Sequence, residues 1–530
     1  MHKLQQQAWA AAAALALVTL VATTSAVAAT TPAPRVIKLD ISKATTPVDR
    51  SFDLSVGADY PGTLIRDDSQ AHLKLAVKEL GFRTVRFHAI FHDVLGTVRE
   101  SNGKLVHDFS GIDRLYDKLL AAGVRPFVEL GFTPEAMATS KQSIFYWKGN
   151  TSHPEPKAWR ALVNDFVRHL QARYGAEEVR SWYFEVWNEP NLDGFWERAD
   201  QAAYFQLYAD TARTIKAIDP ALRVGGPSTA GADWVEPFLA YARTKQVPVD
   251  FVTTHSYGVD GGFLDEKGVE DTQLSPSPDS IVGDVRRVRQ QISASAFPGL
   301  PLFFTEWSTS YNPRDKVHDS YISAPWILTK LKQTQGLAQG MSYWTYTDLF
   351  EEPGPPNATF HGGFGLLTRE GVRKPAWFAW KYLNEVKGLE VPSTDGYTIA
   401  ATEGRHTRVL VWDWQTPDQK MSNRPFYGKP VPSVPAAPVQ LSLSQLQPGT
   451  WRITVRRTGH EANDAYTAWL KMGSPADANA GQIRRLHALT TDRPETTRVV
   501  RVGPAGQLDW KLPMRSNDIA LVTFERLGSR

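Results

Sequence analysis

The chain has 530 residues, which exceeds the usual size of one domain and predicts a large core together with a second module. Its 59 Lys and Arg residues nearly balance 56 Asp and Glu residues and are spread along the chain, so neither nucleic acid nor an acidic partner is indicated. The chain has no cysteine, which excludes disulfides, thiol nucleophiles and cysteine metal sites.

Residues 1–29 are expected to form a secretory signal peptide. A basic start precedes an apolar stretch at 9–22, and small residues at 26–28 supply a cleavage site. The apolar stretch is short for a bilayer span, and no later segment has the length of a transmembrane helix. We therefore expect an exported protein, periplasmic or secreted, with no membrane partner once the leader is removed.

Residues 49–386 alternate short apolar runs with amphipathic stretches, the pattern of repeated strand–helix units in a parallel sheet. Eight such units favour an α/β fold of the (β/α)8 TIM barrel type. A doubly wound open sheet is the alternative, but no glycine-rich phosphate turn follows the first strand. The eight expected strands are residues 55–58, 84–88, 125–131, 182–188, 222–226, 250–255, 302–306 and 341–346.

Residues 387–530 follow a different pattern. Apolar and polar residues alternate one by one at 439–444 and at 451–456, which is typical of a half-exposed antiparallel sheet. Proline and glycine residues separate these runs, so we expect an accessory C-terminal β-sandwich domain. The N-terminal segment 30–48 is a candidate for one further strand of this sandwich.

Two glutamates stand at the ends of expected barrel strands, where barrel enzymes keep their catalytic groups. Glu189 lies in an Asn-Glu-Pro turn after the fourth strand, and Pro190 is expected to stop that strand just after it. Glu306 ends the seventh strand. Glycosidic bond cleavage needs two carboxyl groups, about 5–5.5 Å apart for retention or about 6.5–9.5 Å for inversion, and the sequence leaves this separation open.

Further residues with suitable chemistry are expected around the two glutamates. His88 and His255 sit at strand exits on the same face, where an imidazole can bind sugar hydroxyls. Asn188 places an amide donor next to Glu189. Trp344, near the end of the eighth strand, offers a flat platform for a sugar ring.

Charged residues inside the strands are expected to support this site. Arg86 lies two residues before His88, and Glu185 lies four residues before Glu189. Because strand side chains alternate, each points to the same side of its strand as that site residue, and both are expected to form ion pairs. Arg86, together with Glu129, is a hypothesis for fixing and tuning Glu306. No His-Glu-x-x-His or Gly-x-Ser-x-Gly motif is present, so we expect neither a metal nor a cofactor.

Residues 182–191, which read Trp-Tyr-Phe-Glu-Val-Trp-Asn-Glu-Pro-Asn, resemble the signature of glycoside hydrolase family 39, which contains β-xylosidases and α-L-iduronidases. The resemblance implies that Glu189 is the acid/base and Glu306 the nucleophile. It also suggests that Tyr257 binds the nucleophile carboxylate. Further matches occur in order at residues 84–88, 254–258, 360–367 and 468–475.

The charge of the loop after the eighth strand indicates whether the sugar is neutral or charged. Glu351 and Glu352 lie in it, and it has no basic residue before Arg369 apart from His361. Acids repel a uronate and accept hydrogen bonds from neutral hydroxyls, and the loop also resembles the xylosidase branch. We expect release of β-D-xylose from the non-reducing end of xylo-oligosaccharides by double displacement. Alternatives are an α-L-arabinoside or α-L-iduronide substrate, or a non-catalytic carbohydrate-binding protein; the oligomeric state stays open.

Overall fold

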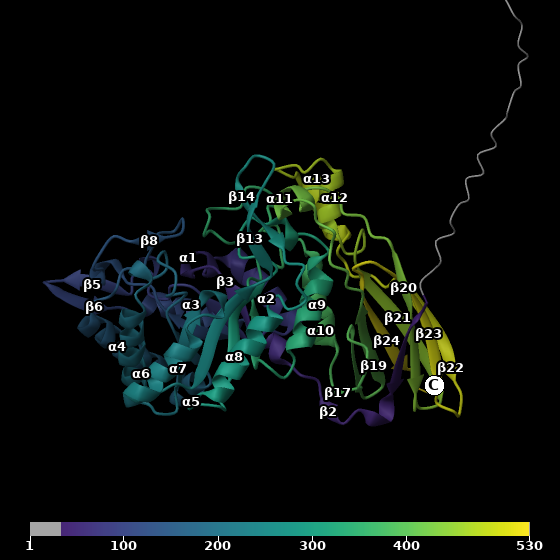
Figure 1. Cartoon of the computed structure of the whole chain (residues 1–530), viewed down its shortest axis with the longest axis horizontal. Coiled ribbons are helices and arrows are strands. Elements are labelled where there is room, and N and C mark those ends of the chain that lie inside the picture. Colours follow the sequence, from purple (N-terminus) through teal and green to yellow (C-terminus); the bar gives the residue numbers. More distant parts are fainter. Residues whose placement is uncertain (1–32, 529–530) are drawn as a thin grey trace, which may run out of the picture.

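The computed structural model describes residues 33–528, and the expected signal peptide, residues 1–29, lies outside them. Figure 1 shows a barrel surrounded by helices on one side of the molecule and the sheets of the C-terminal region on the other. Among the described residues, no helix has both the length and the apolar character needed to cross a membrane.

Eight parallel strands form a closed barrel in the order β10-β11-β12-β15-β16-β3-β4-β7. This closure confirms the predicted barrel and excludes the open sheet, which would leave two edge strands unpaired. The strands are β3 (Ser55–Ala58), β4 (Thr84–Phe87), β7 (Arg125–Leu130), β10 (Tyr183–Val186), β11 (Arg223–Thr229), β12 (Phe251–Tyr257), β15 (Leu302–Ser308) and β16 (Gly340–Tyr343).

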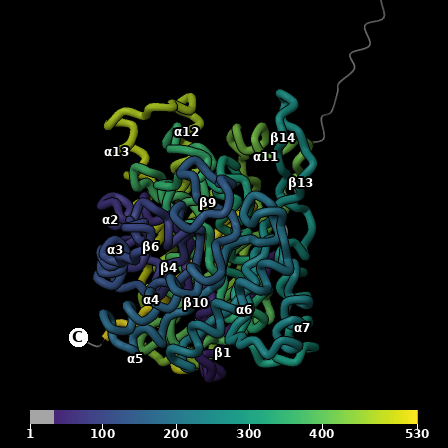
Figure 2. Tube along the Cα trace, turned by 90° about the vertical axis from the view of Figure 1, so that its left-hand side faces the viewer, coloured from purple at the N-terminus to yellow at the C-terminus, as the bar shows by residue number. Residues whose placement is uncertain are grey.

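A long helix follows each barrel strand, and Figure 2 shows α3 and α7 on opposite sides of β4 and β10. In the third unit the Glu155 side chain accepts from the backbone N–H groups of Lys157 and Ala158, and Pro156 occupies the first helical position. The helices are α2 (Asp67–Leu80), α3 (Ser110–Ala121), α4 (Pro156–Tyr174), α6 (Gln201–Ile218), α7 (Val235–Lys245), α8 (Val282–Ala294), α9 (Ser323–Thr334) and α10 (Pro375–Glu385).

The C-terminal region contains a seven-stranded sheet, β2-β17-β18-β19-β24-β21-β22, and a three-stranded sheet, β1-β20-β23. Apolar side chains of both sheets form one buried cluster, as expected for a sandwich. Strand β1 (Arg35–Asp40) pairs in parallel with β20 (Pro435–Ser444). The other strands are β2 (Thr46–Pro47), β17 (Leu389–Glu390), β18 (Thr398–Glu403), β19 (His406–Trp412), β21 (Gly449–Thr458), β22 (Thr496–Val502), β23 (Leu508–Arg515) and β24 (Ile519–Arg526).

Further short elements complete the fold, most of them near the barrel mouth. Tyr466 and Trp469 of α12 pack against Phe360 and Val372 of the loop after β16, so the C-terminal region supports that loop. These elements are α1 (Pro61–Leu64), α5 (Ala176–Arg180), α11 (Asn423–Tyr427), α12 (Ala465–Lys471), α13 (Ala480–Ala488), and the hairpins β5 (Val98–Ser101) with β6 (Lys104–His107), β8 (Ser143–Ile144) with β9 (Gly149–Asn150), and β13 (Val259–Leu264) with β14 (Glu270–Leu274).

Candidate active site

A cavity of about 600 Å³ lies at the carboxyl ends of the barrel strands, a volume within the range of small-molecule sites. Glu189 and Glu306 both line it. The cavity walls come from the loops that follow the strands, so residues far apart in the sequence meet there. This is the place where a (β/α)8 barrel carries its chemistry.

Glu189 reaches the cavity through a turn that differs from the expected one. Strand β10 ends at Val186, three residues before Glu189, so Pro190 is not what stops it. Trp187 and Glu189 adopt positive φ angles of 70° and 44°, which are unfavourable for residues other than glycine. The indole Nε1 of Trp187 donates to the Phe195 carbonyl at 2.6 Å and fixes this turn. The carboxyl of Glu189 is thereby turned into the cavity.

Glu306 is held from two sides. It lies within β15, directly beside His255 of β12. Its Oε1 accepts a hydrogen bond from Arg86 Nη1 at 2.7 Å, and its Oε2 accepts one from the Tyr257 hydroxyl at 2.7 Å. Both oxygens are therefore oriented by donors that suit a carboxylate.

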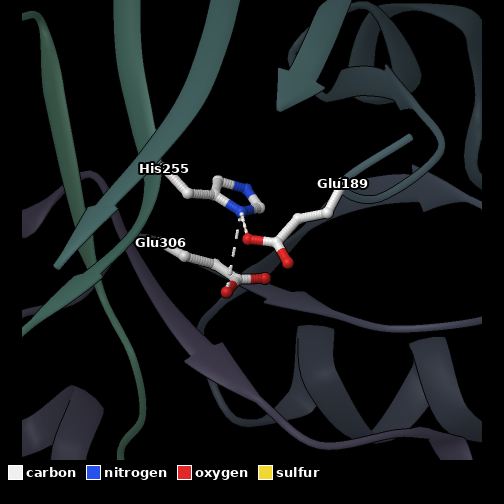
Figure 3. A group of neighbouring side chains, drawn as sticks. All are labelled: Glu189, His255 and Glu306. Atoms are coloured by element: carbon white, nitrogen blue, oxygen red, sulfur yellow. Dashed lines mark hydrogen bonds and ion pairs between the residues drawn. The ribbon is translucent and has the colours of Figure 1, made fainter. Parts of the chain in front are cut away.

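The two glutamates lie close together in different surroundings. One oxygen of each, together with a ring nitrogen of His255, lies within 4.8 Å of the others (Figure 3). Burial raises the pKa of Glu189 to about 7, although the charges of His88 and Arg86 oppose this rise. Glu189 therefore still holds a proton in much of the population near neutral pH, while Glu306 sits between cationic and hydroxyl donors.

His255 lies between the two carboxyl groups rather than on the cavity surface. Its Nδ1 is 2.8 Å from Glu189 Oε1 and 3.7 Å from Glu306 Oε2, and its Nε2 is 3.2 Å from the Thr305 hydroxyl. Burial lowers the pKa of His255 to about 4, so the ring is neutral at neutral pH. Both ring nitrogens have protein partners, so His255 positions Glu189 and is not available to bind a sugar hydroxyl.

The grouping of Glu189, His255 and Glu306 has the residue types and spacing of a metal site. A metal ion is disfavoured there, because both oxygens of Glu306 already accept hydrogen bonds, one of them from the buried guanidinium of Arg86. That guanidinium would repel a second cation in a medium of low dielectric.

Arg86 is the centre of a buried ion cluster behind the cavity. Besides Glu306, its guanidinium lies 2.5 Å from Glu185 and 3.0 Å from Glu129, and it donates to Asn188 Oδ1 at 2.7 Å. Its side chain is completely buried. A fully buried charge of this kind persists only with paired carboxylates and satisfied hydrogen bonds. The cluster thus joins β4, β7, β10 and β15 below the site.

His88 links this cluster to the cavity wall. Its Nδ1 is 2.8 Å from Glu129 and its Nε2 is 3.2 Å from Glu352. Burial favours the neutral ring, but Glu129, Glu352 and Glu306 outweigh it and hold the pKa of His88 well above its ordinary value. Burial raises the pKa of Glu352 to about 7, against the hydrogen bond and charge of His88. His88 is therefore a paired cation at neutral pH.

A second buried ion cluster fixes the loop after β16, which carries Glu352 and Phe364 to the cavity. Lys374 Nζ lies 2.6 Å from Asp319 and 2.7 Å from Asp348, and all three side chains are completely buried. Asp319 belongs to the loop after β15, so Lys374 fastens two neighbouring loops to each other. These loops form one wall of the cavity.

The structure brings most of the expected residues to the cavity but places Glu351 elsewhere. The Glu351 carboxylate turns outward and pairs with Arg66 at 3.0 Å, because its backbone N–H donates inward to Asp59. The backbone N–H of Gly354 donates to the Glu351 carbonyl at 3.0 Å, so the two glutamates begin a tight turn in which Glu352 lines the cavity and Glu351 does not. The expected residues that line the cavity are His88, Asn188, Glu189, Tyr257, Glu306, Trp344 and Glu352.

Several site residues have no counterpart in the expectations from sequence. Thr305 donates to Glu185 at 2.7 Å and contacts His255, and Ser228 contacts Arg86 at 3.3 Å. Thr305 directly precedes Glu306, so simple strand alternation would place the two side chains on opposite faces of the sheet. Strand β15 pairs irregularly with β16 between Phe304 and Trp307, and both side chains reach the same buried ion cluster. The cavity residues Phe145, Leu192, Phe195 and Tyr311 lie on loops, where the sequence carries no comparable signal.

A closed (β/α)8 barrel that holds two glutamates together in a cavity at its carboxyl face defines a glycoside hydrolase. The sequence matches the description "Glycosyl hydrolases family 39" over residues 35–507. The chain belongs to this family, and it is a glycosidase.

Three relatives illustrate the similarity. A family 39 enzyme from Xanthomonas axonopodis pv. citri is 63% identical and superposes with a TM-score of 0.93, over 94% of this chain and 98% of that one. A monomeric β-xylosidase from Caulobacter crescentus CB15 is 63% identical, with a TM-score of 0.92 over 93% of this chain and 100% of that one. A β-xylosidase from Geobacillus stearothermophilus is 33% identical over 90% of this chain and 93% of its own length.

Proposed function

We propose that the protein is a retaining exo-β-xylosidase that releases β-D-xylose from the non-reducing end of xylo-oligosaccharides. The observation that carries this proposal is the approach of one oxygen of Glu189 and one of Glu306 to within 4.8 Å. Retaining enzymes keep their carboxyl groups about 5–5.5 Å apart, whereas inverting enzymes need about 6.5–9.5 Å to admit a water molecule.

Each glutamate has its own part in the proposed double displacement. Glu306 attacks the anomeric carbon while Glu189 gives its proton to the leaving oxygen, so that an alcohol departs and a glycosyl ester forms on Glu306. Glu189, now ionised, takes a proton from water, and the water oxygen displaces Glu306. Arg86 and Tyr257 orient the Glu306 carboxylate through both steps.

The charge of the cavity supports a neutral sugar. Within residues 33–528 the lining contains no Lys or Arg, and its one basic side chain, His88, is paired with Glu129 and Glu352. An iduronide carboxylate would find no free cation and would face Glu352. Two of the three relatives described above carry the name β-xylosidase, which supports xylose as the sugar.

The enclosure of the cavity supports attack at a chain end. The backbone N–H of Tyr146 donates to the carbonyl of Glu352 at 2.8 Å, which joins the loop after β7 to the loop after β16. This contact closes one side of the cavity, where an endo-acting enzyme would need an open groove. We also propose that the protein is exported, on the strength of the leader-like residues 1–29.

Aryl glycosides with β-xylosyl, α-arabinosyl, α-iduronosyl and β-glucosyl groups test the specificity, and proton NMR of the first product tests the stereochemistry. We expect the xyloside to give the highest kcat/KM and β-xylose to appear first. Glu306→Ala should lose at least about 10³-fold in kcat, whereas Glu177→Ala on the exposed helix α5 should retain wild-type activity. Initial α-xylose would refute retention, and a higher kcat/KM for any of the other three glycosides would refute xylose as the preferred sugar.

A further inference from the structure

The cavity is polar at its floor and apolar at its mouth. At the floor, His88, Asn188 and Glu306 are at most 4% exposed. At the mouth, Leu192 is 40% exposed and Tyr311 is 50% exposed, and both line the same cavity. Exposed apolar side chains gathered around a concave site are a mark of ligand binding.

The only exposed aromatic side chains within residues 33–528 both flank this mouth. They are Tyr146, which follows β8, and Tyr311, which lies in the loop after β15. Tyr146 is next to the cavity residue Phe145 and is bonded through its backbone to Glu352. Aromatic rings pack well against other flat rings. Every other aromatic side chain of residues 33–528 is buried or partly buried.

Polar groups near the mouth already have protein partners. The carboxylate of Asp284 accepts from the Ser256 hydroxyl and from Arg287, both at 2.6 Å. The side chain of Asn191, which precedes Leu192, bonds the backbone of Ala230 through both its oxygen and its nitrogen. These two polar side chains of the mouth are therefore already engaged within the protein.

We propose that this mouth is a leaving-group subsite that, besides the second xylose of an oligosaccharide, takes a flat apolar aglycone, such as a phenolic or other aromatic alcohol, and binds it more tightly than that xylose. The inference rests on the proposed function, in which the sugar occupies the polar floor. The leaving oxygen must then face Glu189, and the aglycone passes Leu192 and Phe195, which follow Glu189 on the same loop. Cleavage yields the free alcohol, with the proton from Glu189, and xylose, with the oxygen from water.

Competitive inhibition by non-hydrolysable 1-thio-β-D-xylosides tests the subsite without the influence of leaving-group acidity. The probes are methyl thioxyloside, 2-naphthyl thioxyloside and thio-linked xylobiose. Burying roughly 60 Å² more apolar surface should lower the Ki of the naphthyl compound about 10-fold below that of the methyl compound, which corresponds to about 1.4 kcal/mol. The Ki of thioxylobiose should stay within about threefold of the methyl compound.

Substitutions at the mouth then locate the effect. The ratio of the Ki of the methyl compound to the Ki of the naphthyl compound should fall about three- to fivefold in Leu192→Ser and in Tyr311→Ser. Leu489→Ser, at a similarly exposed leucine of the C-terminal region (42% against 40%), should leave it unchanged.

Three results would overturn the inference. Equal Ki values for the naphthyl and methyl compounds, or tightest binding of thioxylobiose, would refute the subsite while leaving the xylosidase proposal intact. Failure of all three thioxylosides to inhibit a glycosidase that is active on another sugar would refute both. The two failures are therefore distinguishable.

Discussion

Replacing Tyr257 with phenylalanine removes one oxygen atom from the site and leaves the ring in place. The Tyr257 hydroxyl donates to Glu306 Oε2 at 2.7 Å, while Arg86 holds the other oxygen. A hydrogen bond to a charged group is worth about 1.5–3 kcal/mol. If that energy orients the carboxylate for attack, Tyr257→Phe should lower kcat/KM by roughly 10- to 160-fold.

Steady-state kinetics with an aryl β-xyloside, together with thermal melting, give the measurement. The matched control is Tyr116→Phe, because Tyr116 is fully buried and its hydroxyl has no hydrogen-bond partner among the described residues. We expect the control to keep wild-type kinetics and both variants to stay folded. A Tyr257→Phe enzyme with kcat/KM within twofold of wild type would refute the assigned role of this hydrogen bond.

Three further predictions follow from the charged groups. Because burial raises the pKa of Glu189 to about 7 and the reaction needs its acid form, kcat/KM should fall as the pH rises through about 7, and Glu189→Gln should abolish this limb. Arg86→Lys keeps the charge but loses the planar fork, so kcat should fall at least about 100-fold in the same assay. Lys374→Met leaves two buried aspartates unpaired and should lower the free energy of unfolding, measured in urea, by about 3–5 kcal/mol.

Each of these predictions has its own check. Burial also raises the pKa of Glu352 to about 7, so Glu352→Gln must retain the basic limb; a flat profile would assign the limb to Glu352 instead. If the kcat of Arg86→Lys stayed within threefold of wild type, the planar guanidinium of Arg86 would not be needed for catalysis. Lys332→Met, at a partly exposed lysine 3.4 Å from Glu390, should cost less than about 1 kcal/mol, and an equal loss in both lysine variants would contradict the role of burial.

The sequence predicted the elements of the barrel better than their ends. All eight expected barrel strands are present, because each is a short apolar run between amphipathic helices. Strand β10 nevertheless ends at Val186 and not at residue 188, because Trp187 leaves the extended conformation. The short helices α11, α12 and α13 were missed, since they interrupt strand-rich sequence and depend on tertiary packing.

The sequence alone identified the two glutamates. Glu189 follows an apolar run in the Asn-Glu-Pro motif of the family, and Glu306 lies at the end of another apolar run. Their shared cavity, their separation and their unequal environments depend on barrel closure, which brings β10 and β15 together across long stretches of chain. The same holds for His255, which the sequence assigned to the sugar and the structure places between the carboxyl groups. Local pattern determines which segments form strands, whereas burial and charge pairing are set by residues distant in sequence, and those decide which group keeps its proton.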